Sequence, residues 1–381
     1  MKPLLMLALL ALAAEMALAQ PSATTGTGQL GITLSSYGRV RAGAYPYVST
    51  DRELDRLSLV VAQSSSAVYD YTEDSDSTAE VARILTIAGV DSAMETLADN
   101  EYTMLPPKVK VRTAVLGWLN QNYFIVRFTV IADTTGLGTL RFGAIVVPRV
   151  GKIYGGETVK YNAANQTASF FRVGDSPMSY WGLRALGPQV TGVRSMDWDD
   201  YSADPDADAA TDSMRYAMTA YTGFDAEVVA GSNGSVYSVN TGSKAFAAKG
   251  DSAVLYYAVA YGPTENDMNT AMTAAAAKYA MLVTSVRRTE SPAPSAFSLG
   301  GNYPNPFNPS TKIPFSVAQG SDVRLSVHDA LGRVVSVVVD RRMEPGQYVA
   351  TFDASSLSAG IYYYTMTAGR FTETKKMLLV K

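Results

Sequence analysis

The chain has 381 residues, a formal net charge of −3, a single histidine and no cysteine. The lack of cysteine excludes disulfide bonds, thiolate metal sites and a cysteine nucleophile. The near-neutral charge offers neither a basic nucleic-acid-binding surface nor a polybasic membrane patch, so nucleic acid is not an expected partner.

The N-terminus has the pattern of a secretion signal. A short basic start precedes an apolar run from Leu4 to Ala14 and the small-x-small sequence Ala17-Leu18-Ala19. This run is shorter than the ~20 residues that span a bilayer, and the small residues are typical of a cleavage site. We therefore expect residues 1–19 to be a signal peptide, although Glu15, close to the apolar run, leaves earlier cleavage as an alternative. No later stretch approaches 18 uninterrupted apolar residues, so no membrane anchor is expected after it.

Residues 20–288 are expected to form one mainly β domain, because a chain this long exceeds the usual size of a single core and divides into two domains. Strand patterns occur at residues 108–112, 123–131, 140–147 and 254–261. In the second of these, Phe124, Val126, Phe128 and Val130 lie on one side. Gly136-Leu137-Gly138 predicts a turn between strands and not a phosphate-binding loop, because it opens no helix.

One helix is expected, from Asp267 to about Arg288, because strong helix formers dominate this segment. Thr264 or Asn266 can cap its start, and the arginines at its end suit the negative C-terminus of a helix. Residues 78–100 fit either a helix or a strand. The sequence thus predicts a large antiparallel β-sandwich closed by one C-terminal helix.

A stretch rich in proline and serine, residues 289–301, predicts an extended linker. After it, short alternating strands are separated by turns. Val323, Leu325 and Val327 alternate with polar residues, which places the apolar set on one face. Strands at this spacing over residues 302–381 predict a small seven-stranded Ig-like sandwich.

The C-terminal segment resembles the C-terminal sorting domain of type IX (Por) secretion. The resemblance lies in a proline-spaced opening, glycine-containing turns, a Gly-Ile-Tyr strand start and a basic, apolar last strand, which follow the family's order. The residues that carry it are Asn302, Pro304, Asn305, Pro306, Phe307, Asn308, Pro309, Gly332, Gly346, Gly360, Tyr362, Lys376 and Lys381. One departure is His328, where the family more often has an aromatic residue such as tyrosine.

The resemblance implies a route for the protein. Such domains are recognised in the periplasm and carry their cargo through an outer-membrane translocon. A sortase-like peptidase commonly removes them and can attach the cargo to surface lipopolysaccharide, which makes the region around residues 290–300 the implied cut site. We therefore expect a secreted or cell-surface protein; a purely structural Ig-like module is the alternative.

Histidine chemistry is not open to residues 20–288, because His328 is the only histidine of the chain. A Ser-His-Asp triad, a histidine metal centre and a histidine general base are all excluded there. An enzyme in this domain would have to use carboxylates, tyrosine, lysine or serine. A non-enzymatic function is therefore favoured.

An acidic segment is a candidate calcium site. Carboxylates at nearby positions can converge on one calcium ion, which takes six to eight oxygen ligands. The candidate ligands are Asp204, Asp206, Asp208 and Asp212. The likeness to a helix-loop-helix calcium loop is incomplete, because Ala209 stands where that loop needs glycine and Arg215 where it needs glutamate. A solvated acidic loop is the alternative.

Aromatic residues beside carboxylates point to carbohydrate. Trp198 and Tyr201 are candidate sugar-stacking rings, as is Trp181, for which an ordinary core aromatic is the alternative. The neighbouring Asp197 and Asp199 are candidate paired carboxylates for glycoside hydrolysis. Our leading hypothesis is a non-enzymatic adhesion or glycan-binding β-sandwich, and the alternative is a secreted polysaccharide hydrolase.

Overall fold

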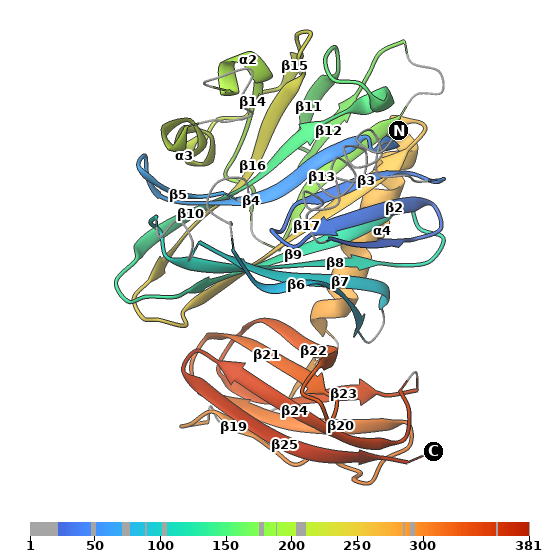
Figure 1. Cartoon of the computed structure of the whole chain (residues 1–381), viewed down its shortest axis with the longest axis vertical. Helices are drawn as coiled ribbons and strands as arrows, with labels where there is room; N and C mark the ends of the chain where they lie inside the picture. The colour runs from blue at the N-terminus through green and yellow to red at the C-terminus, as the bar shows by residue number, and fades with distance from the viewer. Residues whose placement is uncertain are drawn as a thin grey trace, which may run out of the picture.

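The computed structural model describes residues 22–46, 51–70, 77–87, 90–100, 105–174, 179–187, 189–202, 211–284, 286–289, 294–355 and 357–380. This part of the chain is mostly β and forms antiparallel sheets in two lobes (Figure 1), which confirms the predicted fold class. We call residues 22–284 the N-terminal sandwich and residues 286–380 the C-terminal sandwich. Within the described ranges, no helix is long and apolar enough to cross a membrane. The predicted signal peptide lies outside them.

One layer of the N-terminal sandwich is an eight-stranded sheet in the order β1-β2-β3-β4-β10-β16-β14, with β5 paired to β4. Its strands are β1 (Ser22–Gly26), β2 (Leu30–Ser35), β3 (Val40–Ala44), β4 (Leu54–Ser64), β5 (Ala67–Tyr69), β10 (Gly138–Pro148), β14 (Gly192–Asp197) and β16 (Ser235–Phe246). The expected strand at residues 140–147 is β10.

The second layer has the order β15-β11-β12-β13-β17-β9-β8-β7-β6. Its strands are β6 (Ser77–Ile87), β7 (Val90–Asp99), β8 (Val109–Gly117), β9 (Tyr123–Ala132), β11 (Thr158–Asn162), β12 (Thr167–Phe171), β13 (Tyr180–Leu186), β15 (Glu227–Val229) and β17 (Ser252–Gly262). The ambiguous segment 78–100 is therefore a pair of antiparallel strands, β6 and β7.

Apolar side chains from both layers fill the core between the two sheets. Leu57 and Leu59 of β4 pack in one cluster with Phe124 and Phe128 of β9. The predicted inward set of β9 is buried throughout. Burial of the apolar side chains that face each other from the two sheets therefore holds this sandwich together.

Helices cover the outer faces of the two sheets. They are α2 (Trp198–Tyr201), α3 (Asp212–Ala220) and α4 (Glu265–Thr284), and a 3₁₀ turn, η2, spans Val150–Lys152. The side chain of Met218 on α3 packs over Val60 and Ile145 on the eight-stranded sheet. The sequence prediction of one helix did not include α2 and α3. They are only four and nine residues long, too short for a clear helical period.

The expected C-terminal helix is present but ends earlier than predicted. Thr264 caps its start, since its Oγ1 accepts a hydrogen bond from the backbone N–H of Asp267 at 3.1 Å. The helix ends at Thr284, and the two arginines expected in it belong instead to strand β18 (Val286–Thr289). The β-branched residues around this point favour an extended backbone, and β18 pairs with β23 of the C-terminal sandwich.

The C-terminal sandwich has two sheets, β22-β21-β24-β25 and β18-β23-β20-β19. Its remaining strands are β19 (Ser298–Leu299), β20 (Ser310–Val317), β21 (Ser321–His328), β22 (Val334–Met343), β23 (Gly346–Asp353), β24 (Gly360–Ala368) and β25 (Phe371–Leu379). Val323, Leu325 and Val327 face its core, as their alternation predicts. A parallel bridge between Ser336 of β22 and Thr86 of β6 joins the first of these sheets to the N-terminal sandwich.

Candidate functional site

A hollow of about 810 Å³ lies on the outer face of the eight-stranded sheet, where β4 begins and β10 ends. The residues that line it are Arg39, Arg41, Arg52, Asp55, Arg56, Val147, Tyr154, Trp198, Ser232 and Asn233. We call this hollow the arginine cleft. Its concave shape, with basic and aromatic side chains together, makes it the leading candidate site of the N-terminal sandwich.

A β-bulge in β4 brings two charged residues to the same side of the sheet. Leu54 and Leu57, three positions apart, both pack in the core between the sheets. In the ladder with β10, Arg56 is opposite Val147 and Leu54 opposite Pro148, so Asp55 is the extra residue. Asp55 and Arg56 therefore both line the cleft on the outer face.

The carboxylate of Asp55 is the point on which the arginines converge. Arg39 Nη2 lies 2.5 Å from Asp55 Oδ2 and Arg41 Nε lies 3.6 Å from Oδ1, while Arg52 Nε also contacts Oδ1. Burial of Asp55 by itself raises its pKa, but the attraction of Arg39, Arg52 and Arg41 outweighs burial and lowers the pKa below its usual value. Asp55 is therefore ionised and holds the guanidinium groups at the cleft wall.

Two aromatic rings and a polar turn complete the cleft. Tyr154 is 44% exposed, and the guanidinium of Arg149 lies 5.5 Å from the centre of its ring. Trp198, at the start of α2, is partly exposed. Ser232 and Asn233 belong to the turn between β15 and β16.

The two candidate carboxylates of the hydrolase alternative hold this turn in place. Asp197 Oδ1 accepts a hydrogen bond from the backbone N–H of Gly231 at 2.7 Å. Asp199 Oδ1 accepts one from the Nδ2 group of Asn233 at 2.8 Å. Both carboxylates thus have a structural partner beside the cleft, and neither is among its lining residues.

The predicted stacking rings separate into two groups. Trp181 is fully buried between the sheets, and its Nε1 donates to Glu53 Oε2 at 3.4 Å. Tyr201, the last residue of α2, is also buried, and burial raises its pKa to about 12. The prediction of a sugar platform is therefore wrong for these two rings, because the core covers their faces, whereas Trp198 lies at the cleft.

The calcium prediction falls mostly outside the described residues, which include neither Asp204 nor Asp206 nor Asp208. Asp212 begins α3, and its Oδ1 lies 3.7 Å from Arg215 Nη1. Among the residues that the structure describes, no group of three or more acidic or histidine side chains could hold a metal ion. Calcium binding stays a prediction.

Sequence reasoning missed the arginine cleft. A signal is present in residues 51–56, which hold five charged side chains in six positions directly before the mostly apolar residues 57–62. Charged residues at the start of a buried strand are unusual unless they are paired. Their partners at positions 39 and 41 lie on a different strand and its preceding turn, so only the fold brings them together.

The proline-spaced opening of the C-terminal sandwich closes the edge of the last strand. The backbone N–H of Phe307 donates to Leu378 O at 3.0 Å, and that of Val380 donates to Phe307 O at 2.9 Å. Asn305 Oδ1 accepts from the N–H of Leu378 at 2.9 Å. Asn302 is buried, and its Nδ2 donates to Thr311 Oγ1 at 3.0 Å. The opening therefore protects an edge strand that could otherwise pair with other chains.

The other motif residues lie at turns and strand starts. Asp329 Oδ1 accepts from the N–H groups of Leu331 and Arg333, around Gly332 with its positive φ of 81°. Tyr362 Oη donates to Ser358 O at 2.8 Å. Remaining positions of the motif are Pro304, Pro306, Asn308 and Pro309 in the opening, Gly346 at the start of β23, Gly360 at the start of β24 and Lys376 on β25. Lys381 lies outside the described residues.

Solved structures with some likeness to the chain include a bacterial glucoamylase complexed with acarbose (9% identity, 70% of this chain, TM-score 0.44). Another is an α-mannosidase from Enterococcus faecalis V583, with 9% identity over 88% of this chain and a TM-score of 0.37. A third is a putative aldose 1-epimerase from Escherichia coli K12, with 7% identity over 63% of this chain and a TM-score of 0.31. The chain spans 38% and 43% of the length of the first two and 98% of the third. At these values the likeness assigns no activity.

The sequence comparisons bear on the C-terminal sandwich. No curated protein matches the chain. Residues 302–381 match the family model described as the secretion system C-terminal sorting domain. This match covers the proline-spaced opening and the strands β20 to β25 that it closes. Residues 302–381 are therefore a type IX C-terminal sorting domain, which directs export of the chain to the cell surface or the extracellular space.

Proposed function

We propose that the N-terminal sandwich is a non-enzymatic glycan-binding domain, which the sorting domain delivers to the cell exterior, and that the arginine cleft binds an acidic glycan. The observation that supports this is the convergence of Arg39, Arg41 and Arg52 beside the rings of Tyr154 and Trp198 in one hollow. Guanidinium groups bind carboxylate and sulfate groups in a planar, bidentate manner. Aromatic rings offer an apolar face on which a sugar ring can stack.

Asp55 prepares the cleft for an anion. Its carboxylate and its backbone carbonyl already hold the guanidinium groups, since Nε of Arg39 and Nε of Arg41 donate to Asp55 O at 3.2 and 3.3 Å. A ligand anion therefore meets donors with fixed positions and needs to order fewer side chains on binding. Arg41 is the most exposed of the three, at 31% of its side chain, and is the best placed to exchange part of its contacts for a ligand.

The chemistry of the cleft favours binding over hydrolysis. Glycoside hydrolysis uses two carboxyl groups, of which one is a general acid with a raised pKa. Asp55 is the one acidic residue among the described lining residues, and its arginine neighbours lower its pKa. A carboxylate that stays ionised between guanidinium groups has no proton to give to a leaving group.

Isothermal titration of the mature full-length chain with tetragalacturonate tests this proposal. We expect the acidic oligomer to bind and its fully methyl-esterified form, which has the same sugar skeleton without charge, to bind at least tenfold more weakly. Binding of the acidic form should weaken as ionic strength rises, because salt screens exposed charges.

Variants locate the site. We expect Arg41→Gln to lower the affinity for the acidic oligomer by about 10- to 100-fold, the usual effect of removing a hydrogen bond to a charged group. Trp198→Ala should lower it several-fold. Arg333→Gln, which removes an exposed arginine of the sorting domain, is the matched control and should leave it unchanged. Equal binding of both oligomers, or unchanged binding by Arg41→Gln and Trp198→Ala, would contradict the proposal.

A further inference from the structure

Four charged side chains form a closed ring where the two sandwiches meet. Each sandwich gives one carboxylate and one guanidinium: Glu95 of β7 and Arg127 of β9 on one side, Arg324 of β21 and Asp340 of β22 on the other. Arg324 bonds Glu95 in a bidentate manner, at 2.8 Å and 3.2 Å. Arg127 Nη2 lies 3.1 Å from both Glu95 Oε2 and Asp340 Oδ2, and Arg324 Nη1 contacts Asp340 Oδ2.

The ring is buried. The side chain of Glu95 is 0% exposed, that of Asp340 3%, that of Arg127 5% and that of Arg324 15%. Buried charges are costly unless each has a partner of opposite sign. Glu95 and Arg127 come from different strands of the N-terminal sandwich, so this half of the ring is assembled only when that sheet has formed.

Apolar and backbone contacts cover part of the ring. Tyr256 Oη donates to Asp340 O at 2.6 Å. Val337 of β22 packs in one cluster with Leu85 and Tyr256 of the N-terminal sandwich. Beside them β6 pairs with β22, which is the edge strand of the sorting domain's own sheet. The contact therefore combines apolar burial, a covered strand edge and matched charges.

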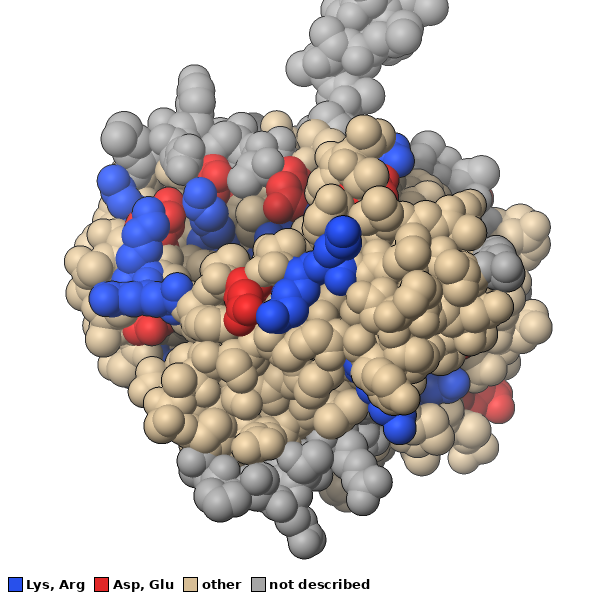
Figure 2. Space-filling model, turned by 90° about the horizontal axis from the view of Figure 1, so that it is seen from below, with Lys and Arg blue, Asp and Glu red and all other residues tan. Residues whose placement is uncertain are grey.

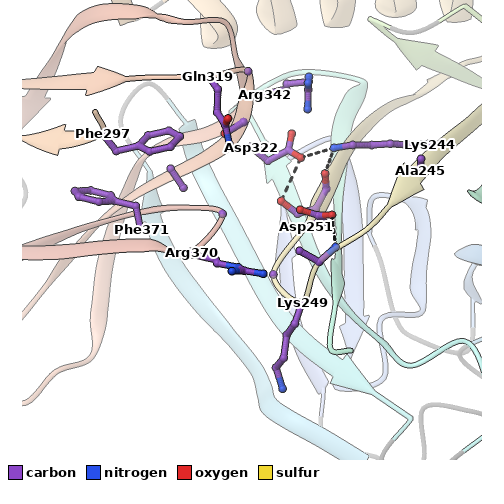
Figure 3. Close-up of a pocket in the computed structure, with 17 residues that line it drawn as sticks. Lys244, Ala245, Lys249, Asp251, Phe297, Gln319, Asp322, Arg342, Arg370 and Phe371 are labelled. Atoms are coloured by element: carbon purple, nitrogen blue, oxygen red, sulfur yellow. Dashed lines mark hydrogen bonds and ion pairs between the residues drawn. The ribbon is translucent and has the colours of Figure 1, made fainter. Parts of the chain in front are cut away.

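A second ion pair bridges the two sandwiches beside a hollow of about 520 Å³. Lys244 Nζ lies 2.8 Å from Asp322 Oδ2, and the hydroxyl of Ser252 donates to the same oxygen at 3.2 Å (Figure 3). Asp322 precedes Arg324 on β21 by two positions, so both residues lie on the same face of that strand. Two charge contacts on one face fix the orientation of the sorting domain as well as its position.

The surface at the sorting-domain end of the molecule is mostly uncharged (Figure 2). Seen from the end formed by the sorting domain, most of the surface is neither acidic nor basic, and charged side chains gather at a few places (Figure 2). Arg324 and Asp340 of the sorting domain are turned toward the N-terminal sandwich, at β21 and β22.

We propose that the outer face of β21 and β22 is a charge-specific docking surface for the folded N-terminal sandwich, so that the sorting domain binds its own cargo there and presents its remaining surfaces to the export machinery. The ring of Glu95, Arg127, Arg324 and Asp340 is the latch of this contact. Because its cargo half needs strands β7 and β9 in place on either side of β8, docking distinguishes a folded cargo from an unfolded one.

Small-angle X-ray scattering of the mature full-length chain measures docking directly, because an undocked sorting domain increases the radius of gyration. We expect the wild type to be compact. Arg324→Met leaves Glu95 and Asp340 without this partner, and we expect it to shift the docking equilibrium by about a hundredfold or more toward the undocked form. Glu95→Gln should act in the same direction. The double variant should shift the docking equilibrium by less than the two single effects combined, because the two residues contact each other.

Further variants keep the test independent of misfolding. Tyr256→Phe removes one hydrogen bond to Asp340 without burying a charge, and should shift docking several-fold in the same direction. Arg333→Met, in an exposed ion pair within the sorting domain, is the matched control and should change nothing. Near-ultraviolet circular dichroism checks that each variant keeps its two folded cores. An extended wild type, or folded Arg324→Met and Tyr256→Phe variants as compact as the wild type, would overturn the proposal.

Discussion

Asp55 and Glu95 are carboxylates that arginines hold in the ionised form. Burial raises the pKa of each, but around Asp55 the attraction of Arg39, Arg52 and Arg41 outweighs burial. Around Glu95 the groups that outweigh it are Arg324, Arg112 and Arg127, and the pKa falls well below the usual range. Protonation of these two carboxylates at low pH would therefore weaken the ion pairs of the arginine cleft and of the docking latch.

The sign of this effect gives a prediction for acid stability. A carboxyl group whose folded pKa is lowered stabilises the fold above its unfolded pKa, about 4, and this contribution is lost as pH falls through the folded value. We expect the free energy of unfolding, measured by urea titration, to be greatest above pH 5 and to fall steadily below pH 4. Asp55→Asn should be less stable than the wild type at pH 7 and should lose less on acidification. A free energy that does not change between pH 5 and pH 2 would contradict this reasoning.

Two tryptophans with different surroundings allow a matched comparison. Trp181 is fully buried, and its ring stacks on that of Phe170 with centres 6.3 Å apart, whereas Trp198 is partly exposed at the cleft. We expect Trp181→Ala to lower the free energy of unfolding by about 3–5 kcal/mol, because it leaves a cavity in the core. Trp198→Ala should cost clearly less. Equal losses of unfolding free energy for the two variants in urea titrations would contradict this prediction.

Helix α4 packs on β13 through a point of close approach at Gly182. A Cβ at this position would overlap the Sδ atom of Met268 and lie 3.3 Å from the Cε atom of Met272, both on α4. We expect Gly182→Ala to destabilise the N-terminal sandwich by about 1–3 kcal/mol in thermal or urea unfolding, because the helix must move away from the sheet. Gly301→Ala, where a Cβ meets no atom within 4 Å, is the control and should have almost no effect.

The strands that the sequence predicts well are those with a strong local pattern. β9 and β17 are long runs of β-branched and aromatic residues, and burial on both faces makes almost every position apolar. The sorting motif was equally accessible, because its opening is a consecutive segment whose prolines exclude a helix. Residues 78–100 were ambiguous because bulges in the pairing of β6 with β7 break the alternation.

The arginine cleft and the docking latch depend on contacts between distant segments. The bulge at Asp55 leaves no periodic signal in the sequence, yet it decides which side of the sheet that carboxylate faces. Arg324 and Glu95 are 229 positions apart, so neither residue alone indicates that the other is its partner. The end of α4 was misplaced for a similar reason, since β18 is extended where the edge of β23 offers it a partner.

For the whole molecule, the sorting domain sets the destination. We expect a chain that lacks residues 302–381 to remain in the periplasm, and the full chain to reach the cell surface or the medium, as measured by immunoblots of cell fractions. The shortened chain loses Arg324 and Asp340, so its N-terminal sandwich should first be shown to be folded by protease resistance. Equal amounts of both chains outside the cell would contradict this expectation.

Strand β18 gives the connection between the two sandwiches an unusual property. Residues 286–289 precede the proline-rich stretch in the sequence, but they are hydrogen-bonded to β23 as an outer strand of the sorting domain. A protease that cuts after Thr289 would thus sever the covalent chain and leave one strand of the C-terminal sheet on the other fragment. The two pieces should then travel together through a native sizing column and part only in denaturant, so that hydrolysis and physical release are separate events.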